Sequence, residues 1–309
     1  MPLGVVFALI AYGLYSCGDA IVKSFTAQLS VFEIGFFANV FALLPAAFAK
    51  PKGEHWREAF QLSAPWLMHI RGVTAVISSV AITYSFTTIP LAEAYSIAFL
   101  NPVFITLLSV VALKERVTVD RWLLIAISFA GVLVVVRPGF RELHWGHLTA
   151  VVSAVAGAAS TTILRVVSGR EKKLSIVAMN GAYQIIGTGL LMSLGFFVML
   201  SPMQLLRLVG IGLLGGTAQL FIITALQRAP ASHIAPLQYS QLLWAVFFGS
   251  VFYLEFPDQV GIAGLIVVVL AGIGTIFADG ARTRVAGRWA EFRARKEGPK
   301  FTEVEGPEI

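Results

Sequence analysis

Two apolar stretches of the chain carry amides and aromatic rings at matching positions, about 140 residues apart. The first reads IPLAEAYSIAFLNPVFITLLSVVALKE and the second APASHIAPLQYSQLLWAVFFGSVFYLE, so that Asn101 aligns with Gln241 and Phe104 with Trp244. At about 100° per residue, these side chains fall on one stripe of each helix. An amide beside an aromatic ring suits a cavity that binds a partly polar organic solute. The alternative is that the amides form hydrogen bonds between helices.

Hydroxyls and amides in other apolar runs extend this candidate substrate site. Ser78 lies in the third run, and its neighbour Ser79 aligns with Gln219 in the second half of the chain. We expect the hydroxyls and amides to bond polar groups of a solute, and the rings to contact its apolar part. The candidates for substrate contact are Asn101, Gln241, Trp244, Gln238, Tyr239, Phe104, Tyr95, Ser78, Ser79, Gln219, Tyr12 and Ser16.

Four ionisable side chains lie within apolar runs or near their ends, where a charge is costly and marks a solute or proton pathway by default. Asp19 is one of them, and it is also placed for an ion pair with Lys23 one turn away. Arg71 either contacts a solute carboxylate or pairs with Glu115 or Asp120 near the same face. The candidates for charge binding or proton coupling are Asp19, Arg71, Glu93 and His233.

A proline opens each of the two matching stretches. Pro90 precedes Glu93, and Pro230 precedes His233 at the equivalent position. Because histidine titrates near neutral pH, Glu93 and His233 are placed for proton exchange. The two prolines are candidates for gating or hinge positions. We expect Glu33, at the start of another apolar run, to be solvated.

The composition is that of a membrane protein. Hydrophobic residues make up 57% of the 309 residues and charged residues only 13%, and the mean hydropathy is +0.80. A soluble domain carries about 25% charged residues. The basic residues behind the net charge of +6 sit in short loops and at the C-terminus, so we expect no nucleic-acid partner. The single cysteine, Cys17, excludes an intramolecular disulfide.

Motifs of catalysis and cofactor binding are missing from the sequence. It contains no phosphate-binding loop of an NTPase, no HExxH motif and no cysteine and histidine set with metal-ligand spacing. We therefore expect no catalytic residues, no metal and no cofactor. A membrane enzyme that acts on lipid is an alternative from another class, but it would need a clustered nucleophile, base or metal site. A channel is a third possibility, which the lack of a charge ring disfavours.

Apolar runs long enough to cross a hydrocarbon core of about 30 Å recur along the chain. In lipid every backbone amide must be satisfied within its own segment, so these runs are expected to be helices. The fold class is therefore an all-α polytopic membrane protein. Ten spans are predicted, at roughly 3–23, 31–49, 64–87, 91–112, 120–136, 147–167, 174–200, 203–226, 231–254 and 259–279.

The distribution of basic residues predicts the orientation. With both termini in the cytoplasm, the inner loops and the tail carry 18 of the 23 lysines and arginines, as the positive-inside rule requires. Two copies of five helices then have opposite orientations, because five is odd. The sequence thus predicts two inverted five-helix repeats, the architecture of many secondary transporters.

The chain resembles the EamA family of the drug/metabolite transporter superfamily. The resemblance rests on the glutamate that ends each matching stretch ("ALKERVT", "YLEFPDQ") and on the glycine-rich end of each half ("ISFAGVLVVVRPG", "VVVLAGIGTIFADG"). It covers about residues 3–279. The predicted units are residues 1–138 and 139–280, one EamA-like repeat each, and 281–309, a basic cytoplasmic tail that is partly disordered. The resemblance implies a central cavity bounded by helices 1, 3, 4, 6, 8 and 9.

The resemblance also implies a function, a place and partners. The chain is similar to bacterial exporters of aromatic and neutral amino acids, so we expect amino-acid export across a bacterial inner membrane by alternating access. The alternative within the superfamily is export of another small metabolite or a drug. The expected partners are a small-molecule solute and the lipid bilayer, and the expected oligomeric state is a monomer.

Overall fold

The structure is a computed structural model that describes eight parts of the chain. They are residues 3–26, 28–48, 61–114, 119–137, 142–167, 170–195, 197–228 and 234–274. All regular secondary structure within these ranges is helical, as predicted. The predicted tail of residues 281–309 lies outside them. The elements are α1 (Leu3–Lys23), α2 (Val31–Phe48), α3 (Pro65–Thr88), α4 (Leu91–Ala98), α5 (Asn101–Leu113), α6 (Val119–Val136), α7 (Trp145–Val167), α8 (Lys173–Ser193), α9 (Pro202–Arg228), the 3-10 helix η2 (Ala235–Tyr239), α11 (Ser240–Tyr253) and a last helix, Gln259–Gly274.

Several of these helices meet the requirements of a membrane span. Six segments of the described residues are long and apolar enough to cross a membrane: Leu3–Lys23, Pro65–Thr88, Leu91–Leu108, Trp145–Leu164, Ser175–Ser193 and Pro202–Ile222. Shorter apolar helices are Val31–Pro45, Trp122–Val136 and Gln259–Gly274. Large apolar side chains such as Leu190 and Leu243 are more than half exposed on the outside of the bundle, which suits a surface covered by lipid.

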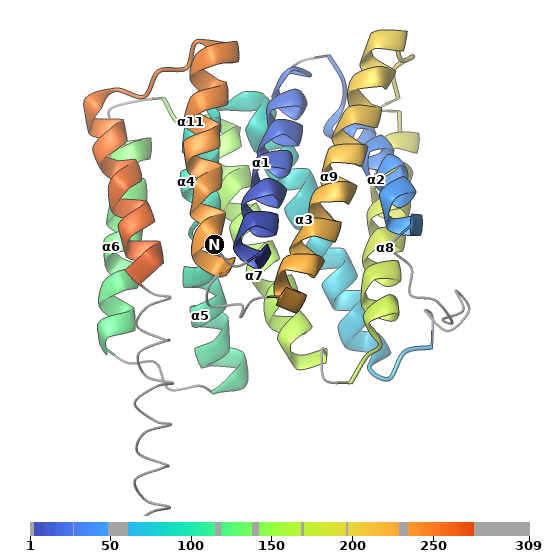
Figure 1. The fold of residues 1–309 in the computed structure, drawn as a ribbon, viewed down its shortest axis with the longest axis horizontal. Helices are drawn as coiled ribbons and strands as arrows, with labels where there is room; N and C mark the ends of the chain where they lie inside the picture. Colours follow the sequence, from blue (N-terminus) through green and yellow to red (C-terminus); the bar gives the residue numbers. More distant parts are fainter. Residues whose placement is uncertain are drawn as a thin grey trace, which may run out of the picture.

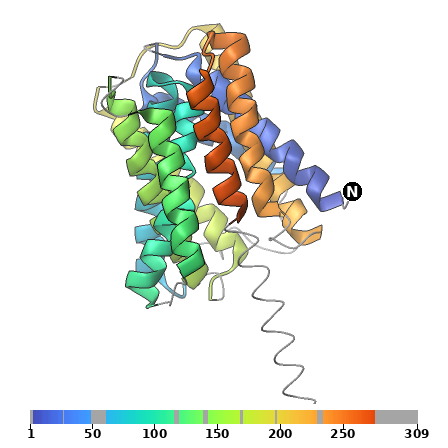
Figure 2. The ribbon, with the colours of Figure 1, turned by 90° about the vertical axis from the view of Figure 1, so that its left-hand side faces the viewer.

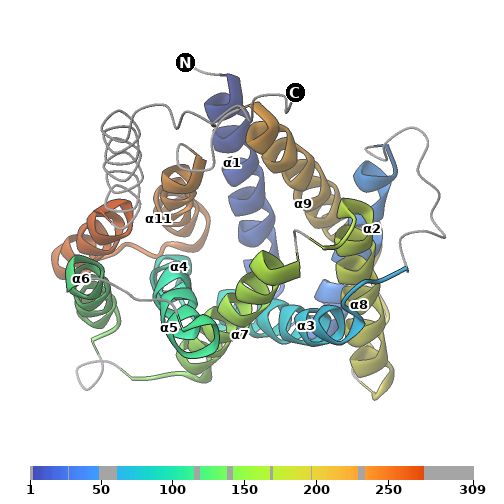
Figure 3. The same ribbon diagram turned by 90° about the horizontal axis from the view of Figure 1, so that it is seen from below.

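The helices pass back and forth between two ends of the bundle (Figure 1). Seen along the bundle, α5, α7, α3 and α8 form one row, and α11, α1, α9 and α2 form another (Figure 3). Helices α1 and α9 pack together, and so do α3 and α7; α2 packs on α9, and α8 on α3. Helix α6 and the Gln259–Gly274 helix lie side by side at one end of the rows (Figure 2).

Two predicted spans are not continuous helices, so the prediction of an unbroken helix was wrong in both. The run 91–112 breaks at Phe99, between α4 and α5, and the run 231–254 contains the 3-10 helix η2 before α11. Pro102 has no N–H to bond the carbonyl of Ala98, the residue at which α4 ends. Pro236 opens η2 in the second half. Stripes drawn for one continuous helix therefore change direction at each break.

Other helix ends differ from the predictions for local reasons. Helix α8 ends at Ser193 and not near residue 200, because Gly195 follows in a conformation with a positive φ of 104°. Lys114 and Leu254 follow α5 and α11, and both have a φ of 54°. This left-handed conformation is uncommon for residues with a side chain. It occurs at matching positions of the two halves.

Candidate solute-binding site

The two helix breaks meet inside the bundle. The rings of Phe99 and Tyr239 have their centroids 4.9 Å apart. Tyr95 lies 6.0 Å from Phe99, and Phe86 lies 5.2 Å from Tyr95. All four rings are buried. An aromatic cluster thus joins the broken parts of α4 and η2 to α3.

A chain of polar groups runs across the same place. The hydroxyl of Tyr95 in α4 donates to the carboxylate of Asp19 in α1. The amide nitrogen of Gln241 in α11 donates to the Tyr95 oxygen over 3.5 Å. The hydroxyl oxygens of Ser16 and Ser240 are buried and have no hydrogen-bond partner. Three helices therefore bring a carboxylate, a phenol, an amide and two unpaired hydroxyls into one region.

The polar face of α1 continues away from Asp19. Tyr12 and Tyr15 precede it by seven and four residues, so all three lie on one side of the helix. The Tyr15 hydroxyl donates to the Gln219 carbonyl oxygen of α9 over 2.7 Å. Tyr12 packs beside the small apolar cluster that contains Ile234. The sequence analysis did not select Tyr15, although its spacing from Asp19 indicated the shared face.

Asn101 and Ser78 come together at α7. The Asn101 amide donates to the Ala154 carbonyl over 3.1 Å, and the Ser78 hydroxyl donates to the Ser153 carbonyl over 2.9 Å. A methyl group on Gly157 would lie 2.9 Å from the Asn101 nitrogen and 3.0 Å from the Ser78 oxygen. Both bonds are of the kind that the interhelical alternative requires. Contact with a solute stays a prediction for these two residues.

Trp244 and Gln241 occupy different sides of α11. Gln241 is buried, whereas Trp244 is 38% exposed and its neighbour Leu243 is 72% exposed. The Trp244 ring stacks on Phe248 at 5.7 Å and packs against Gly13 of α1. The stripe predicted from residues 241 and 244 therefore spans the edge between the buried and the exposed side of the helix.

Three further candidates lie apart from the breaks or form other contacts. Phe104 is partly buried and packs on the main apolar core. Gln238 is exposed in η2. Ser79 is half-buried in α3, where its carbonyl accepts a hydrogen bond from Thr83 over 2.8 Å.

Lys23 does not pair with Asp19, so that alternative was wrong. Its ammonium lies 2.7 Å from Oε1 of Glu255 and also donates to the Ile89 carbonyl at 2.7 Å. The backbone N–H of Leu91 donates to the other oxygen of Glu255 at 3.2 Å. Lys23 is only 6% exposed. We call this part of the bundle the Lys23 end; here one buried ion pair joins α1, the α3–α4 link and the end of α11.

More bonds close the Lys23 end. The Tyr253 hydroxyl donates to the Ala20 carbonyl, and Thr26 donates to the Thr87 carbonyl over 2.9 Å. A cavity of about 230 Å³ lies next to the ion pair and is lined in part by Glu255. Because these bonds cross between α11, α1 and α3, the helices cannot separate here without breaking them.

Two further ionic pairs lie near this end. Glu93 is buried and lies 3.0 Å from the Nε2 atom of His147, the first residue pair to join α4 and α7 in this way. Arg137 forms an ion pair with Asp258 between α6 and the Gln259–Gly274 helix. The hydrogen bond to Asp258 raises the pKa of the exposed Arg137 guanidinium above its usual value.

The remaining charged and hinge candidates divide into described and undescribed residues. The Nε atom of Arg71 is buried without a hydrogen-bond partner. Its proposed partner Glu115 lies outside the described residues, as do His233 and Pro230. Pro90 is the residue directly before α4.

The expectation that Glu33 is solvated was wrong. It is fully buried, and its carboxylate accepts from the backbone N–H groups of Ser30 at 3.1 Å and Val198 at 2.9 Å. A buried carboxylate needs such donors. Here they come from the start of α2 and from the segment between α8 and α9.

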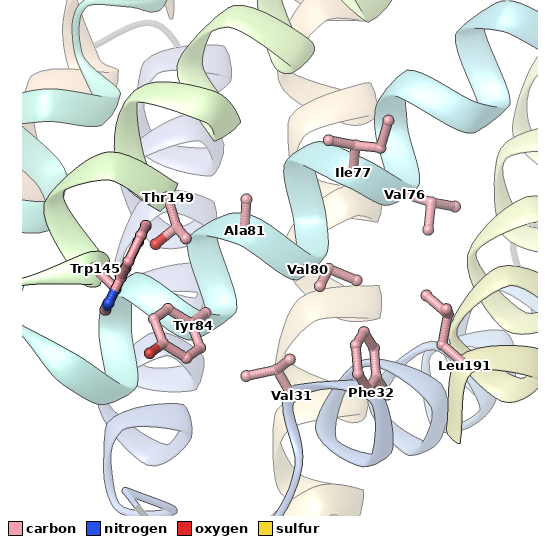
Figure 4. A pocket seen from close by; sticks show the side chains of 10 residues that line it. All are labelled: Val31, Phe32, Val76, Ile77, Val80, Ala81, Tyr84, Trp145, Thr149 and Leu191. Atoms are coloured by element: carbon pink, nitrogen blue, oxygen red, sulfur yellow. The ribbon is translucent and has the colours of Figure 1, made fainter. Parts of the chain in front are cut away.

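A second pocket opens on the side of the bundle, between α2, α3, α7 and α8 (Figure 4). Trp145, Tyr84 and Thr149 lie at one side of it, and Phe32 and Leu191 at the other. Almost all of the remaining lining is aliphatic. The pocket offers few groups to a polar solute, so we place the candidate solute site at the helix breaks.

Comparison with known proteins gives relatives along the whole length of the chain. The EamA-like transporter family matches twice, at residues 2–137 and 144–277. An S-adenosylmethionine uptake transporter of Rickettsia prowazekii is 23% identical over 282 residues, which are 89% of this chain and 93% of that protein. The pseudopaline exporter CntI of Pseudomonas aeruginosa is 28% identical over 272 residues, 87% of this chain and 94% of the exporter.

A eukaryotic protein and a solved structure extend the comparison. Human solute carrier family 35 member G1 is 27% identical over 309 aligned residues, which cover 88% of this chain and 78% of that protein. A solved crystal structure, titled only as that of a protein, superposes with a TM-score of 0.63 at 16% identity. It covers 91% of this chain and 98% of its own, and at that identity the likeness concerns the fold alone.

Proposed function

The chain belongs to the EamA-like transporter family, and on that premise we propose that it carries a small organic metabolite across the membrane by alternating access of two inverted halves. Its family makes it a multi-pass membrane transporter and not an enzyme. The proposal adds the cargo, the inversion, the orientation and the site at the helix breaks.

Backbone conformation supports the repeat. Lys114 and Leu254 are 140 residues apart and share a φ of 54°, directly before the glutamate that ends each matching stretch. The breaks after α4 and after η2 fall at the same spacing. The two family matches, 2–137 and 144–277, also agree with units close to the predicted 1–138 and 139–280.

Contacts between the halves support a two-fold relation. Phe99 and Tyr239 are equivalent residues and contact each other, as residues on a symmetry axis do. A methyl group on Gly264 would lie 3.0 Å from Val134, and one on Gly274 would lie 2.9 Å from Leu124. These two contacts exchange with each other when every residue is replaced by its equivalent 140 positions away. The paired packing of α1 with α9 and α3 with α7 has the same property.

The site at the breaks suits alternating access. Broken helices near the middle of the membrane expose backbone groups to a solute, and the sites of many transporters lie there. The Lys23 end is closed by the Lys23–Glu255 pair. With both termini in the cytoplasm this end faces outward, so the pair belongs to the outer gate of the proposed cycle. Release of solute to the outside then requires that this pair breaks.

The relatives favour the broader of the two cargo predictions. One is named for uptake of S-adenosylmethionine and another for export of pseudopaline. Neither name is that of an aromatic or neutral amino acid. We therefore place another small metabolite ahead of amino acids as the cargo. A bacterial inner membrane as the location rests on the bacterial relatives and on the predicted orientation.

Counterflow in proteoliposomes tests the proposal. Vesicles that hold the full chain and are loaded with unlabelled solute are placed in labelled S-adenosylmethionine, or in labelled phenylalanine in a parallel series. We expect saturable accumulation of a metabolite, more of S-adenosylmethionine than of phenylalanine, and none in vesicles without protein. Failure to accumulate these solutes or any component of a labelled metabolite extract would contradict the transport function. Accumulation of phenylalanine alone would restore the amino-acid prediction.

A further inference from the structure

We propose that the carboxylate of Asp19 is the counter-ion for a protonated amine of the transported solute. This proposal rests on the transporter function proposed above and names the class of its cargo. It predicts that the site prefers a solute with a positively charged, hydrogen-bonding nitrogen to an uncharged or anionic solute of the same shape.

Asp19 lacks a basic partner of its own. Among the residues that the structure describes, no lysine or arginine forms an ion pair with it, and its bonded neighbour is the Tyr95 hydroxyl. Lys23, one turn away, is held by Glu255 and by the Ile89 carbonyl. A carboxylate inside a membrane span is costly without a compensating charge. A cation carried by the solute would supply that charge.

The surroundings of Asp19 suit an organic cation more than a metal ion. Tyr95 lies beside it, and Tyr15 and Tyr12 lie along the same side of α1. The faces of aromatic rings attract organic cations. Within the described residues, no group of three histidine, cysteine, aspartate or glutamate side chains is placed to hold a metal. The combination of one carboxylate with several phenol rings is therefore that of an amine site.

Unpaired hydroxyls nearby indicate that a hydrogen-bonding group is to be accommodated. Ser16 is 2% exposed, precedes Asp19 by three residues on the same face of α1, and its hydroxyl has no partner. The Ser240 hydroxyl is also buried without a partner, next to Gln241, which bonds Tyr95. Buried polar atoms without a partner are rare. A primary ammonium has three N–H donors, enough for the carboxylate and for hydroxyls of this kind.

Access to the carboxylate completes the argument. Asp19 itself is partly exposed, whereas Ser16 and Tyr95 behind it are buried. A solute amine can therefore approach the carboxylate from the accessible side, while the buried groups hold it in place. Tyr95 is a positioning residue here, since its hydroxyl bond orients the Asp19 carboxylate.

A set of four compounds with one skeleton and different charges tests the proposal. They are phenethylammonium, phenylalanine, 2-phenylethanol and 3-phenylpropionate, which are a cation, a zwitterion, an uncharged compound and an anion. Binding to the purified full chain is measured by isothermal titration calorimetry in detergent. The variants are Asp19→Asn, which keeps the shape and removes the charge, and Asp19→Glu, which keeps the charge. Asp258→Asn is the matched control, because it removes a carboxylate at the Lys23 end, away from Asp19.

We expect phenethylammonium to bind most tightly of the four compounds. Its dissociation constant should rise at least about tenfold in Asp19→Asn, as loss of a charge-assisted bond implies, and change less in Asp19→Glu and in Asp258→Asn. Equal binding of the uncharged compound or the anion by the wild type would overturn the proposal, as would unchanged affinity of folded Asp19→Asn. So would transport of another solute by a chain that binds no amine. In those cases the counterflow result, and with it the transport function, stands independently.

Discussion

The ammonium of Lys23 and the carboxylate of Glu255 lie 2.7 Å apart in a buried ion pair, although 231 residues separate them along the chain. The pair connects the first helix of one half to the end of α11 in the other. Removal of one partner from a buried ion pair leaves an unpaired charge and costs about 3–5 kcal/mol. We expect Glu255→Gln to lower the melting temperature of the purified protein by several degrees and to reduce counterflow, because the outer gate no longer closes.

The exposed pair of Arg137 and Asp258 is the control for this prediction. Its side chains are 21% and 46% exposed, and exposed pairs contribute about 0–1 kcal/mol. Asp258→Asn should leave the melting temperature almost unchanged. If both variants shift it equally, the Lys23–Glu255 pair has no special role in closing this end.

The contact between Phe99 and Tyr239 should be cooperative. Their ring centroids are 4.9 Å apart, and aromatic pairs contribute about 0.5–1.5 kcal/mol beyond burial. A double-mutant cycle with Phe99→Leu and Tyr239→Leu should give a coupling free energy in that range, measured by unfolding in mixed detergent. Tyr239→Phe keeps the ring and should retain most of the stability. Additive effects of the two leucine variants would mean that the two breaks do not support each other.

Gly264 should tolerate no side chain. A methyl group there would lie 2.8 Å from Val135 and 3.0 Å from the backbone oxygen of Gly131, which cannot move without α6. Gly264→Ala is expected to destabilise the protein by about 1–3 kcal/mol, the usual cost of overpacking. Gly181→Ala in α8, where a methyl group meets nothing within 4 Å, should be neutral or slightly stabilising, because alanine favours helices by about 1 kcal/mol. A harmless Gly264→Ala would contradict the close packing of α6 on the last helix.

The break after α4 should matter for transport more than for stability. Pro102→Ala restores an N–H that can bond the Ala98 carbonyl and extend the helix through Phe99. We expect counterflow to fall while the melting temperature stays the same or rises. Circular dichroism and the melting curve check folding, and Pro257→Ala, in the loop before the last helix, is the control. Full activity of Pro102→Ala would mean that the break is dispensable.

The sequence predicted most helix positions but not the breaks. Apolar runs set the ends of α1, α2 and α3 to within about a residue, because the length of a span is fixed by the membrane. Hydropathy does not distinguish a continuous helix from two short ones, so the breaks after Ala98 and at η2 were missed. Pro102 and Pro236 were the signals, since each removes a backbone donor.

The candidate site was predicted as a set of residues but not as a set of contacts. Tyr95, Gln241 and Asp19 were each selected by type, yet helical spacing indicated Lys23 as the partner of Asp19. Lys23 instead bonds Glu255, a residue from the other half that no local pattern could place beside it. Partners that differ by more than a few turns in sequence depend on how the helices pack. For the same reason the burial of Glu33 by Val198 was not foreseen.

Reversible cross-linking across the Lys23 end tests alternating access most directly. In a Cys17→Ser background, Lys23→Cys and Glu255→Cys are joined by a short bis-methanethiosulfonate reagent, and counterflow is measured before cross-linking, after it, and after reduction. The proposed cycle predicts that the cross-link abolishes counterflow, that reduction restores it, and that either single cysteine is unaffected by the reagent. Unchanged counterflow after complete cross-linking would show that the Lys23 end need not open, and would contradict the account.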